Sequence, residues 1–101
     1  MRIVGMGRLE AGWIRHPDLK EPLQKWITVV GGAAWKHPRH MREMLPSADL
    51  LDLGHRTVVI FNVKGNAYRL IANVDFSRQV VNILLLLTHA EYDKEKWKGT
   101  L

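Results

Sequence analysis

The C-terminal half of the chain contains three consecutive segments that have the composition of β-strands and are separated by very short connections. The segments span residues 57–63, 67–76 and 79–88, and they are rich in β-branched and aromatic residues. Only residues 64–66 and 77–78 lie between them. Because connections this short join antiparallel neighbours, the sequence predicts an antiparallel sheet in this half of the chain.

The third segment contains an almost wholly apolar run over residues 80–87. A strand with this pattern is usually covered on both faces, as a central strand of a sheet is. Because successive side chains of a strand point to opposite faces, we expect Ile83 and Leu85 on one face and Leu84 and Leu86 on the other. An uncovered strand of this kind would be prone to aggregation, so helices should cover one face and further chain the other.

The N-terminal half has the three-and-four apolar spacing of helices. After a short strand at residues 2–4, we expect a helix over residues 8–15 that ends before Pro17, because proline disfavours a helical residue in front of it. Asp18 is the expected N-cap of a second helix, and residues 35–45 are expected to form a shorter third one. The buried face of the second helix is predicted to contain Leu19, Leu23, Trp26, Ile27 and Val30.

Together these segments predict an α+β fold in which N-terminal helices pack on one face of a small, mainly antiparallel sheet. The C-terminal segment over residues 91–97, or a partner protein, is expected to help cover the other face. Trp13, Trp26 and Trp35 occupy core-like helical positions and are assigned to packing. Trp97 lies among lysines near the terminus, and the sequence leaves its role open.

The composition narrows the classes of protein to which the chain can belong. With 101 residues, 47% of them hydrophobic, we expect one domain over residues 1–101 and no separate cofactor-binding unit. The formal net charge of +5 favours attraction to polyanions such as nucleic acid, or to an acidic partner. The absence of cysteine excludes disulfides and cysteine-based nucleophiles, and no apolar run approaches the roughly 20 residues of a membrane helix. A soluble cytoplasmic protein is therefore expected.

Three residues of the C-terminal half carry side chains that metal-independent RNA cleavage requires. Such cleavage needs groups that accept and donate protons, and a cation that stabilises the charged phosphorane. Arg69 offers a charged fork that matches phosphate, His89 is a candidate acid or base, and Tyr92 can donate a proton or stack on a base. Further positive charge is expected from Arg56, Lys64 and Lys94.

Each of these residue types also has a structural explanation. A histidine at a strand end is more often exposed or hydrogen-bonded than catalytic, and a strand arginine is usually solvated or ion-paired. Asn62 and Asn66 flank Gly65 in a predicted hairpin turn, which asparagine and glycine favour. His37 and His40 lack a third ligand in pattern, so no metal site is predicted. From the residues alone, the chain is a basic α+β domain suited to binding nucleic acid.

Two C-terminal segments resemble the signature of a known family. They are Phe61-Asn62-Val63 followed by Gly65-Asn66 and Tyr68-Arg69-Leu70, and the segment from Thr88 to Asp93. The N-terminal half adds a matching order of motifs: Trp13, His16-Pro17, Leu23, Trp26, Trp35-Lys36-His37-Pro38 and Leu45-Pro46-Ser47-Ala48-Asp49. In these features, across essentially the whole chain, the sequence resembles the HigB-type toxins, which have a RelE-like fold.

The resemblance implies that the protein is the toxin of a type II toxin–antitoxin system. Such a toxin is a ribosome-dependent endoribonuclease, or mRNA interferase, which cuts mRNA and so inhibits translation without a cofactor. The implied partners are mRNA on the ribosome and a cognate helix-turn-helix antitoxin of the HigA type, and operator DNA is reached only through that antitoxin. The alternative is a non-catalytic RNA-binding or protein-interaction module of the same fold.

Carried over position by position, the catalytic groups that the resemblance implies are Arg69, His89 and Tyr92. The expected RNA-binding residues are Arg56, Lys64, Asp93 and Lys94. In the resulting hypothesis His89 and Tyr92 handle protons while Arg69 stabilises the pentacoordinate phosphate. Leu84 departs from the family, which often has a basic residue there. The leucine implies either weaker RNA binding or a face covered by an antitoxin or a second copy of the chain.

Overall fold

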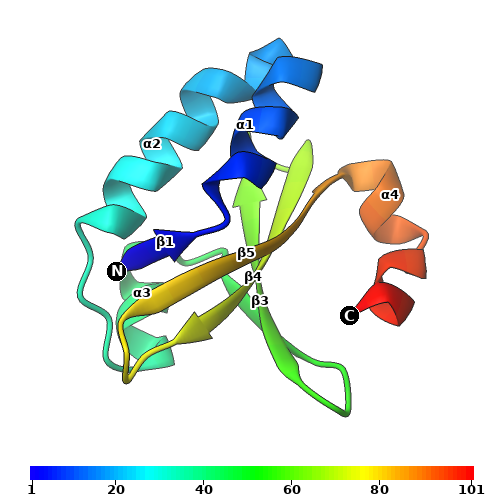
Figure 1. The fold of residues 1–101 in the computed structure, drawn as a ribbon. Helices are drawn as coiled ribbons and strands as arrows, with labels where there is room; N and C mark the ends of the chain where they lie inside the picture. The colour runs from blue at the N-terminus through cyan, green and yellow to red at the C-terminus, as the bar shows by residue number, and fades with distance from the viewer.

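The computed structural model describes residues 1–101, with helices packed around a five-stranded sheet (Figure 1). In chain order the elements are β1 (Arg2–Val4), α1 (Met6–Arg15), the 3₁₀ helix η1 (Pro17–Leu19), α2 (Lys20–Gly31), α3 (Pro38–Met44), β2 (Asp49–Asp52), β3 (Thr57–Val63), β4 (Tyr68–Asp75), β5 (Val80–Thr88), α4 (His89–Asp93) and the 3₁₀ helix η2 (Lys96–Thr100). None of these helices combines the length and the apolar character that a bilayer span would require.

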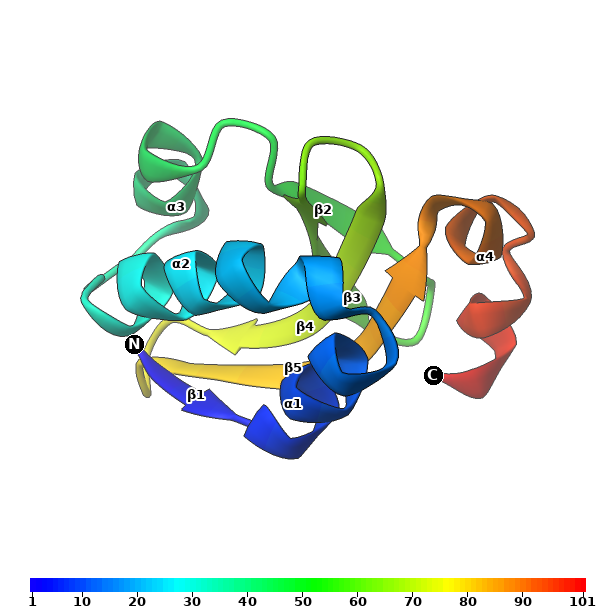
Figure 2. The same cartoon turned by 90° about the horizontal axis from the view of Figure 1, so that it is seen from above.

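The strands are ordered β1-β5-β4-β3-β2 across the sheet. The pairs from β2 to β5 are antiparallel, and only β1 runs parallel to its neighbour β5. Figure 2 shows α1 and α2 lying together over one face of the sheet. The predicted α+β fold, with N-terminal helices on one face of a mainly antiparallel sheet, is therefore confirmed. The bounds of β3, β4 and β5 agree with the predicted strands to within about one residue.

The helix-covered face of the sheet carries the main hydrophobic core. Leu23 of α2 is fully buried there, and Phe61 of β3 lies between two tryptophans. Trp26 meets the Phe61 ring edge-on at 5.3 Å between centroids, and Trp35 stacks on it at 6.5 Å. Trp13 is half-buried against the same core. The packing role predicted for these three tryptophans is confirmed, but Trp35 lies in the connection before α3 and not in the predicted helix over residues 35–45, which begins only at Pro38.

Asp18 does not cap α2, contrary to the prediction. Pro17 opens the 3₁₀ helix η1, and Leu19 occupies the N-cap position of α2 without a side-chain cap. The backbone N–H of Leu19 donates to the carbonyl oxygen of His16, which is the short-range bond of a 3₁₀ turn. Because Asp18 lies inside this turn, its carboxylate reaches across to Lys64 instead of the first turn of α2.

A β-bulge changes the side-chain alternation that was predicted for the apolar run of β5. The pairing of β4 with β5 skips Leu84, so that two residues of β5 occupy the space of one. Ile83 and Leu86 therefore face the helices, whereas Leu84 and Leu85 face the other side. The prediction that Ile83 shares a face with Leu85, and Leu84 with Leu86, is wrong because the inserted residue reverses the alternation.

The face of the sheet away from α1 and α2 carries a smaller hydrophobic cluster. Its buried members are Val58, Ile60, Ile71 and Trp97. Trp97 is 5% exposed, so the C-terminal segment covers this face as predicted, and the open question about this tryptophan is answered. Leu84 is half-buried against the same cluster. Leu84 thus contributes to packing within the chain.

Candidate active site

Arg69 of β4 and Tyr92 of α4 meet on the face of the sheet away from α1 and α2. The guanidinium carbon of Arg69 lies 5.3 Å from the centroid of the Tyr92 ring, in a cation–π contact. The ring stacks in turn on Trp97, at 5.5 Å and 19° between the planes. Arg69 Nη1 donates to the carbonyl oxygens of Asn66 at 2.9 Å and Tyr68 at 3.3 Å. These bonds hold the guanidinium in place and leave its Nε and Nη2 donors without a partner in the chain.

His89 is the first residue of α4 and follows directly on β5. Thr88 caps the helix: its hydroxyl accepts a hydrogen bond from the Glu91 N–H at 3.1 Å, and the Glu91 carboxylate accepts one from the Thr88 N–H at 2.9 Å. The bond from the Thr88 backbone is the main cause that holds the pKa of Glu91 below its ordinary value. The His89 N–H donates to the carbonyl oxygen of Ala67 at 2.9 Å. A five-residue helix is thereby fixed to the β3–β4 hairpin.

The imidazole of His89 is oriented by Asp93. Its Nδ1 lies 2.7 Å from Asp93 Oδ2, one turn further along α4. Because a carboxylate only accepts hydrogen bonds, this contact favours the His89 tautomer that carries its proton on Nδ1. The two side chains are 49% and 57% exposed, so a substrate can reach them from solvent. Asp93, which was predicted among the RNA contacts, is placed here as the partner of the histidine.

The strand register accounts for the closeness of the predicted catalytic residues. Arg69 pairs with Leu87, the last residue but one of β5, and His89 begins α4 immediately beyond that strand. Tyr92 follows His89 at a spacing of three residues, which places the two side chains on neighbouring positions of the same helical turn. The structure thus gathers Arg69, His89 and Tyr92 at one end of the sheet, with Arg69 and Tyr92 in direct contact.

Lys64 does not join this group. It lies in the β3–β4 turn with a φ of +52°, and Gly65 follows at +63°. Lys64 Nζ donates to Asp18 Oδ2 at 2.7 Å, and the Tyr68 hydroxyl donates to the same oxygen at 3.3 Å. The hydrogen bond between Lys64 and Asp18 is the main cause that raises the pKa of Lys64 and lowers the pKa of Asp18. The ammonium is therefore directed at η1, and Arg69 lies on the other face of the sheet.

Arg56 and Lys94, the remaining predicted RNA contacts, lie at very different distances from the group. Arg56 precedes β3 and comes six residues before Asn62, which pairs with Arg69. Along an extended strand this separation corresponds to about 20 Å. Lys94 is the C-cap of α4, two residues after Tyr92, and it is exposed. The structure brings Lys94 close to the group and leaves Arg56 at the far end of β3.

No group of three or more histidine, aspartate or glutamate side chains is arranged to hold a metal ion. His37 instead caps α3, because its Nδ1 accepts a hydrogen bond from the backbone N–H of Arg39 at 3.1 Å. The His40 ring lies 6.1 Å from that of His37. The three-residue spacing of His37 and His40 thus reflects the start of α3 and not a metal site.

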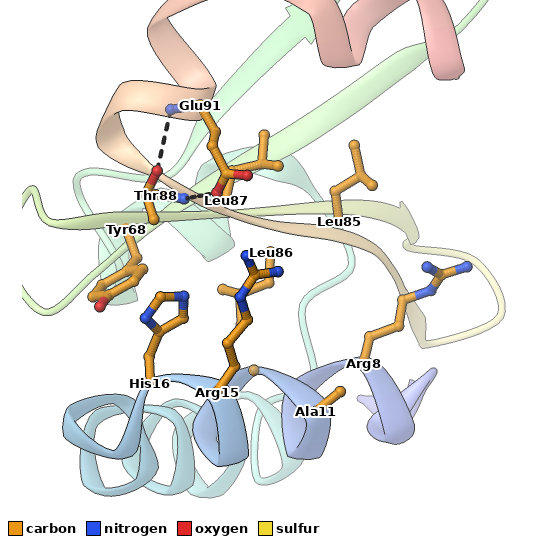
Figure 3. A pocket seen from close by; sticks show the side chains of 11 residues that line it. Arg8, Ala11, Arg15, His16, Tyr68, Leu85, Leu86, Leu87, Thr88 and Glu91 are labelled. Carbon is orange, nitrogen blue, oxygen red and sulfur yellow. Dashed lines mark hydrogen bonds between the residues drawn. The ribbon is translucent and has the colours of Figure 1, made fainter.

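A groove that was not predicted from the sequence lies between α1 and the end of β5 (Figure 3). Its polar lining consists of Arg8, Arg15, His16, Tyr68, Thr88 and Glu91. One feature of the sequence does indicate one wall of this groove. On one side of the α1 helix, two small residues lie between two arginines, in the order Arg8, Ala11, Gly12 and Arg15. The other wall of the groove comes from β5 and α4, and the sequence does not reveal that these elements lie opposite these residues.

Comparison with known proteins bears on this site. A family model described as HigB toxin, the RelE-like toxic component of a toxin–antitoxin system, matches residues 19–95. The chain is 29% identical over 93 residues to the mRNA interferase toxin HigB of Escherichia coli (strain K12), which covers 92% of this chain and 88% of that protein. The proteins named mRNA interferase HigB from Escherichia coli O157:H7 and Shigella flexneri match to the same extent.

These matches confirm the resemblance that the C-terminal motifs suggested. The family model spans α2, β5 and α4, and so includes Arg69, His89 and Tyr92. Because that match extends over well more than half of the sequence, the chain belongs to the HigB toxin family, the RelE-like toxic components of toxin–antitoxin systems.

Proposed function

We propose that the protein is an mRNA interferase that cleaves mRNA by acid–base catalysis without a metal ion. Membership of a family of toxic components, and the activity named for the relatives in Escherichia coli and Shigella flexneri, support an endoribonuclease. The observation that carries the proposal is the gathering of Arg69, His89 and Tyr92 at the end of β5, with Asp93 bound to the histidine. One cation and two proton-handling groups are what the reaction requires.

In the proposed reaction a 2′-oxygen of RNA attacks the adjacent phosphorus, and the bond from phosphorus to the 5′-oxygen breaks. The 2′-hydroxyl loses one proton and the leaving 5′-oxygen gains one, so the step balances with a 2′,3′-cyclic phosphate and a 5′-hydroxyl as products. His89 Nε2 and the Tyr92 hydroxyl handle these two protons, one each. The unpartnered Nε and Nη2 donors of Arg69 stabilise the phosphorane oxygens.

The ribosome, in this proposal, presents the mRNA to the site. His89 and Asp93 are about half exposed, so the candidate residues lie on an open surface and not in an enclosing cavity. An open site makes few contacts that could fix the attacking oxygen in line with the leaving oxygen, and a misplacement of about 1 Å can cost roughly 100-fold in rate. A ribosome that already holds the mRNA would supply this positioning.

As the toxic component of a toxin–antitoxin system, the protein has an antitoxin as its partner. We propose that this antitoxin is of the HigA type, with a helix-turn-helix fold, and that the pair reaches operator DNA through the antitoxin alone. The net charge of +5 favours a partner with an acidic binding surface.

The proposal is tested by inducing the natural chain, Arg69→Ala and His89→Ala separately in cells, and by mapping transcript 5′ ends. The natural chain should arrest growth and create new transcript ends, whereas both variants should do neither. Arg78→Ala is the matched control, because it removes a guanidinium that is 83% exposed at the β4–β5 turn, far from the site. This control should remain toxic.

Melting temperatures and antitoxin binding of each variant show whether a loss of toxicity reflects chemistry or folding. Arg69 is half-buried, so this check matters most for that variant. Full toxicity with unchanged transcript ends in both Arg69→Ala and His89→Ala would contradict the proposed roles. RNA binding without any new transcript ends from the natural chain would instead identify the non-catalytic module of the same fold.

A further inference from the structure

The groove between α1 and β5 exists because the edge strand β1 is short. β1 pairs with β5 only from Val80 to Asn82, so the rest of β5 is flanked by α1 instead of by a strand. Gly5 turns the chain between β1 and α1 with a φ of +94°, and it packs directly on Ile83. Leu86 then packs against Gly12 of α1, and the groove opens beside this contact (Figure 3).

Two arginines flank the groove along α1. Arg8 and Arg15 are seven residues apart, so they lie on the same side of the helix at about 10 Å from each other along its axis. Ala11 and Gly12 lie between them and leave the floor open. Neither arginine forms an ion pair with a carboxylate of the chain, and both are exposed. Two guanidinium forks are therefore available to an anionic ligand.

The one carboxylate in the groove is already engaged. Glu91 accepts the hydrogen bond of the Thr88 N–H in the capping box of α4, and this bond is the main cause of its lowered pKa. The charges of Arg15 and His16 contribute to that lowering less than the bonds from Thr88 do. With one engaged carboxylate against two arginines, the groove keeps an excess of positive charge.

One end of the groove lies at the end of β5, beside the first residue of the candidate active site, whereas Arg69 and Tyr92 lie on the other face of the sheet. Thr88 lines the groove and is followed immediately by His89. At the same end the rings of His16 and Tyr68 lie 5.4 Å apart at 59°, and they form an aromatic surface beside the cations. Cations along a track with aromatic rings at one end are the features by which proteins bind single-stranded nucleic acid.

We propose that this groove binds the phosphodiester backbone of the RNA strand that flanks the cleavage position, with Arg8 and Arg15 as the phosphate contacts. The inference rests on the proposed function, which places a phosphodiester at the neighbouring end of β5. His16 and Tyr68 offer a stacking surface for a base at the Thr88 end of the groove. RNA fits better than an acidic peptide, because the groove combines two unpaired guanidinium groups with an aromatic surface and reaches Thr88, which directly precedes His89. Arg8, Arg15 and His16 all precede the segment that the family model matches.

The test measures the affinity of the full chain for a single-stranded RNA analogue with 2′-O-methyl groups throughout, which cannot be cleaved by 2′-oxygen attack. The variant Arg8→Gln/Arg15→Gln should raise Kd about tenfold or more. Its plot of log affinity against log salt should be flatter by about 1.4, because each lost phosphate contact on a single strand removes about 0.7. Ala11→Glu, which adds a carboxylate to the exposed floor of the groove, should weaken binding as well.

The matched control is Arg39→Gln/Arg42→Gln on α3, which removes the same charge from two exposed arginines outside the groove. It should keep most of the affinity and the steeper salt slope. Equal affinities and slopes for the two double variants would overturn the proposal. So would an oligoglutamate peptide whose binding requires Arg8 and Arg15 while RNA binding does not.

The two proposals fail in different ways. If the groove inference fails, the Arg8→Gln/Arg15→Gln protein binds the RNA analogue like the control, while transcript cleavage still depends on Arg69 and His89. If the proposed function fails, no transcript ends depend on Arg69 or His89, while the RNA analogue still requires the two groove arginines. Circular dichroism and melting temperature confirm that each variant is folded, as expected for substitutions of exposed side chains on α1 and α3.

Discussion

Lys64 Nζ lies 2.7 Å from Asp18 Oδ2, and this ion pair joins two segments that are 46 residues apart in the sequence. It ties the tip of the β3–β4 hairpin to η1, just before α2 begins. The Tyr68 hydroxyl adds a hydrogen bond of 3.3 Å to the same carboxylate oxygen. A cation that was expected to bind RNA and a carboxylate that was expected to cap a helix thus balance each other's charge.

Asp18→Asn is expected to reduce the acid sensitivity of the fold. The pKa of Asp18 is lowered in the folded protein, mainly by the hydrogen bond from Lys64. A carboxyl group of this kind contributes stability above its unfolded pKa of about 3.9, and that contribution is lost as the pH falls through the folded pKa. The natural chain should therefore lose more stability than Asp18→Asn between pH 7 and pH 3, as measured by urea unfolding.

The control for this comparison is Glu10→Gln, which removes an exposed carboxylate that has no ion pair in the chain. The stability that Glu10→Gln loses between pH 7 and pH 3 should equal the stability that the natural chain loses. Because the Lys64 and Asp18 side chains are 47% and 44% exposed, added salt should also narrow the difference. An identical pH dependence for Asp18→Asn and the natural chain would show that the ion pair does not stabilise the fold.

Tyr92→Phe should separate proton transfer from packing. The Tyr92 ring is held between the guanidinium of Arg69 and the indole of Trp97, and phenylalanine keeps both contacts. If the hydroxyl handles a proton, transcript cleavage should fall by roughly 10²- to 10⁴-fold while the melting temperature stays the same. Tyr92→Ala should lower both. Cleavage by Tyr92→Phe at the natural rate would assign the second proton to another group.

Gly5→Ala should destabilise the protein, whereas Gly7→Ala should not. Gly5 has a φ of +94°, and an added Cβ would lie 3.0 Å from the carbonyl oxygen of Ile83. The left-handed backbone alone costs a residue other than glycine about 1–2 kcal/mol, and a loss of 1 kcal/mol lowers the melting temperature of a domain of this size by about 4–8 °C.

Gly7 lies in α1, and an added Cβ there would meet nothing within 4 Å beyond its chain neighbours and the backbone of its own helix. Alanine there should raise the melting temperature slightly, because it favours a helix by up to about 1 kcal/mol over glycine. Melting curves of the two variants in one buffer give the comparison. Equal melting temperatures would mean that the turn before α1 relaxes without cost.

The three central strands were predictable because each depends on local signals. Apart from Asn62, every residue of Thr57–Val63 is β-branched or aromatic. The connections that follow β3 and β4 are too short for anything but antiparallel pairing. β2 gave no such signal, since Asp49–Asp52 has only four residues and no alternation of polar with apolar side chains. Its strand state comes from pairing with β3, which is a contact outside the segment.

The bulge at Leu84 and the α1–β5 groove could not be predicted either, because both depend on contacts between separate segments of the chain. In a run where every residue is apolar, no polar position marks which side chains face the helices, so a one-residue insertion leaves no trace. The groove needs the end of β1 at Val4 and the path of α1 beside β5, and both are tertiary features. Arg69, His89 and Tyr92 were predicted from their residue types and from the family resemblance, and the pairing of Arg69 with Leu87 brings the start of β4 beside the end of β5.

We expect Trp97 to be the residue that contributes most to holding Tyr92, and through it Arg69, in place. Trp97 is buried against Ile71 and its neighbours, it stacks on Tyr92, and its Nε1 donates to the Tyr92 carbonyl oxygen at 3.0 Å. Trp97→Ala removes all three contacts and should cost about 3–5 kcal/mol of unfolding free energy in urea titrations.

Trp97→Phe tests whether the geometry of the candidate site depends on the packing of Trp97 or on its hydrogen bond to Tyr92. Phenylalanine keeps most of the apolar contact and the stacking on Tyr92 but lacks the donor, so we expect a loss of only about 1–2 kcal/mol and near-natural cleavage. Trp97→Ala should reduce cleavage even at temperatures where it remains folded, because Tyr92 and with it Arg69 lose their support. Natural cleavage by folded Trp97→Ala would mean that the reactive side chains hold their geometry without the C-terminal segment, and that this segment serves only to cover the sheet.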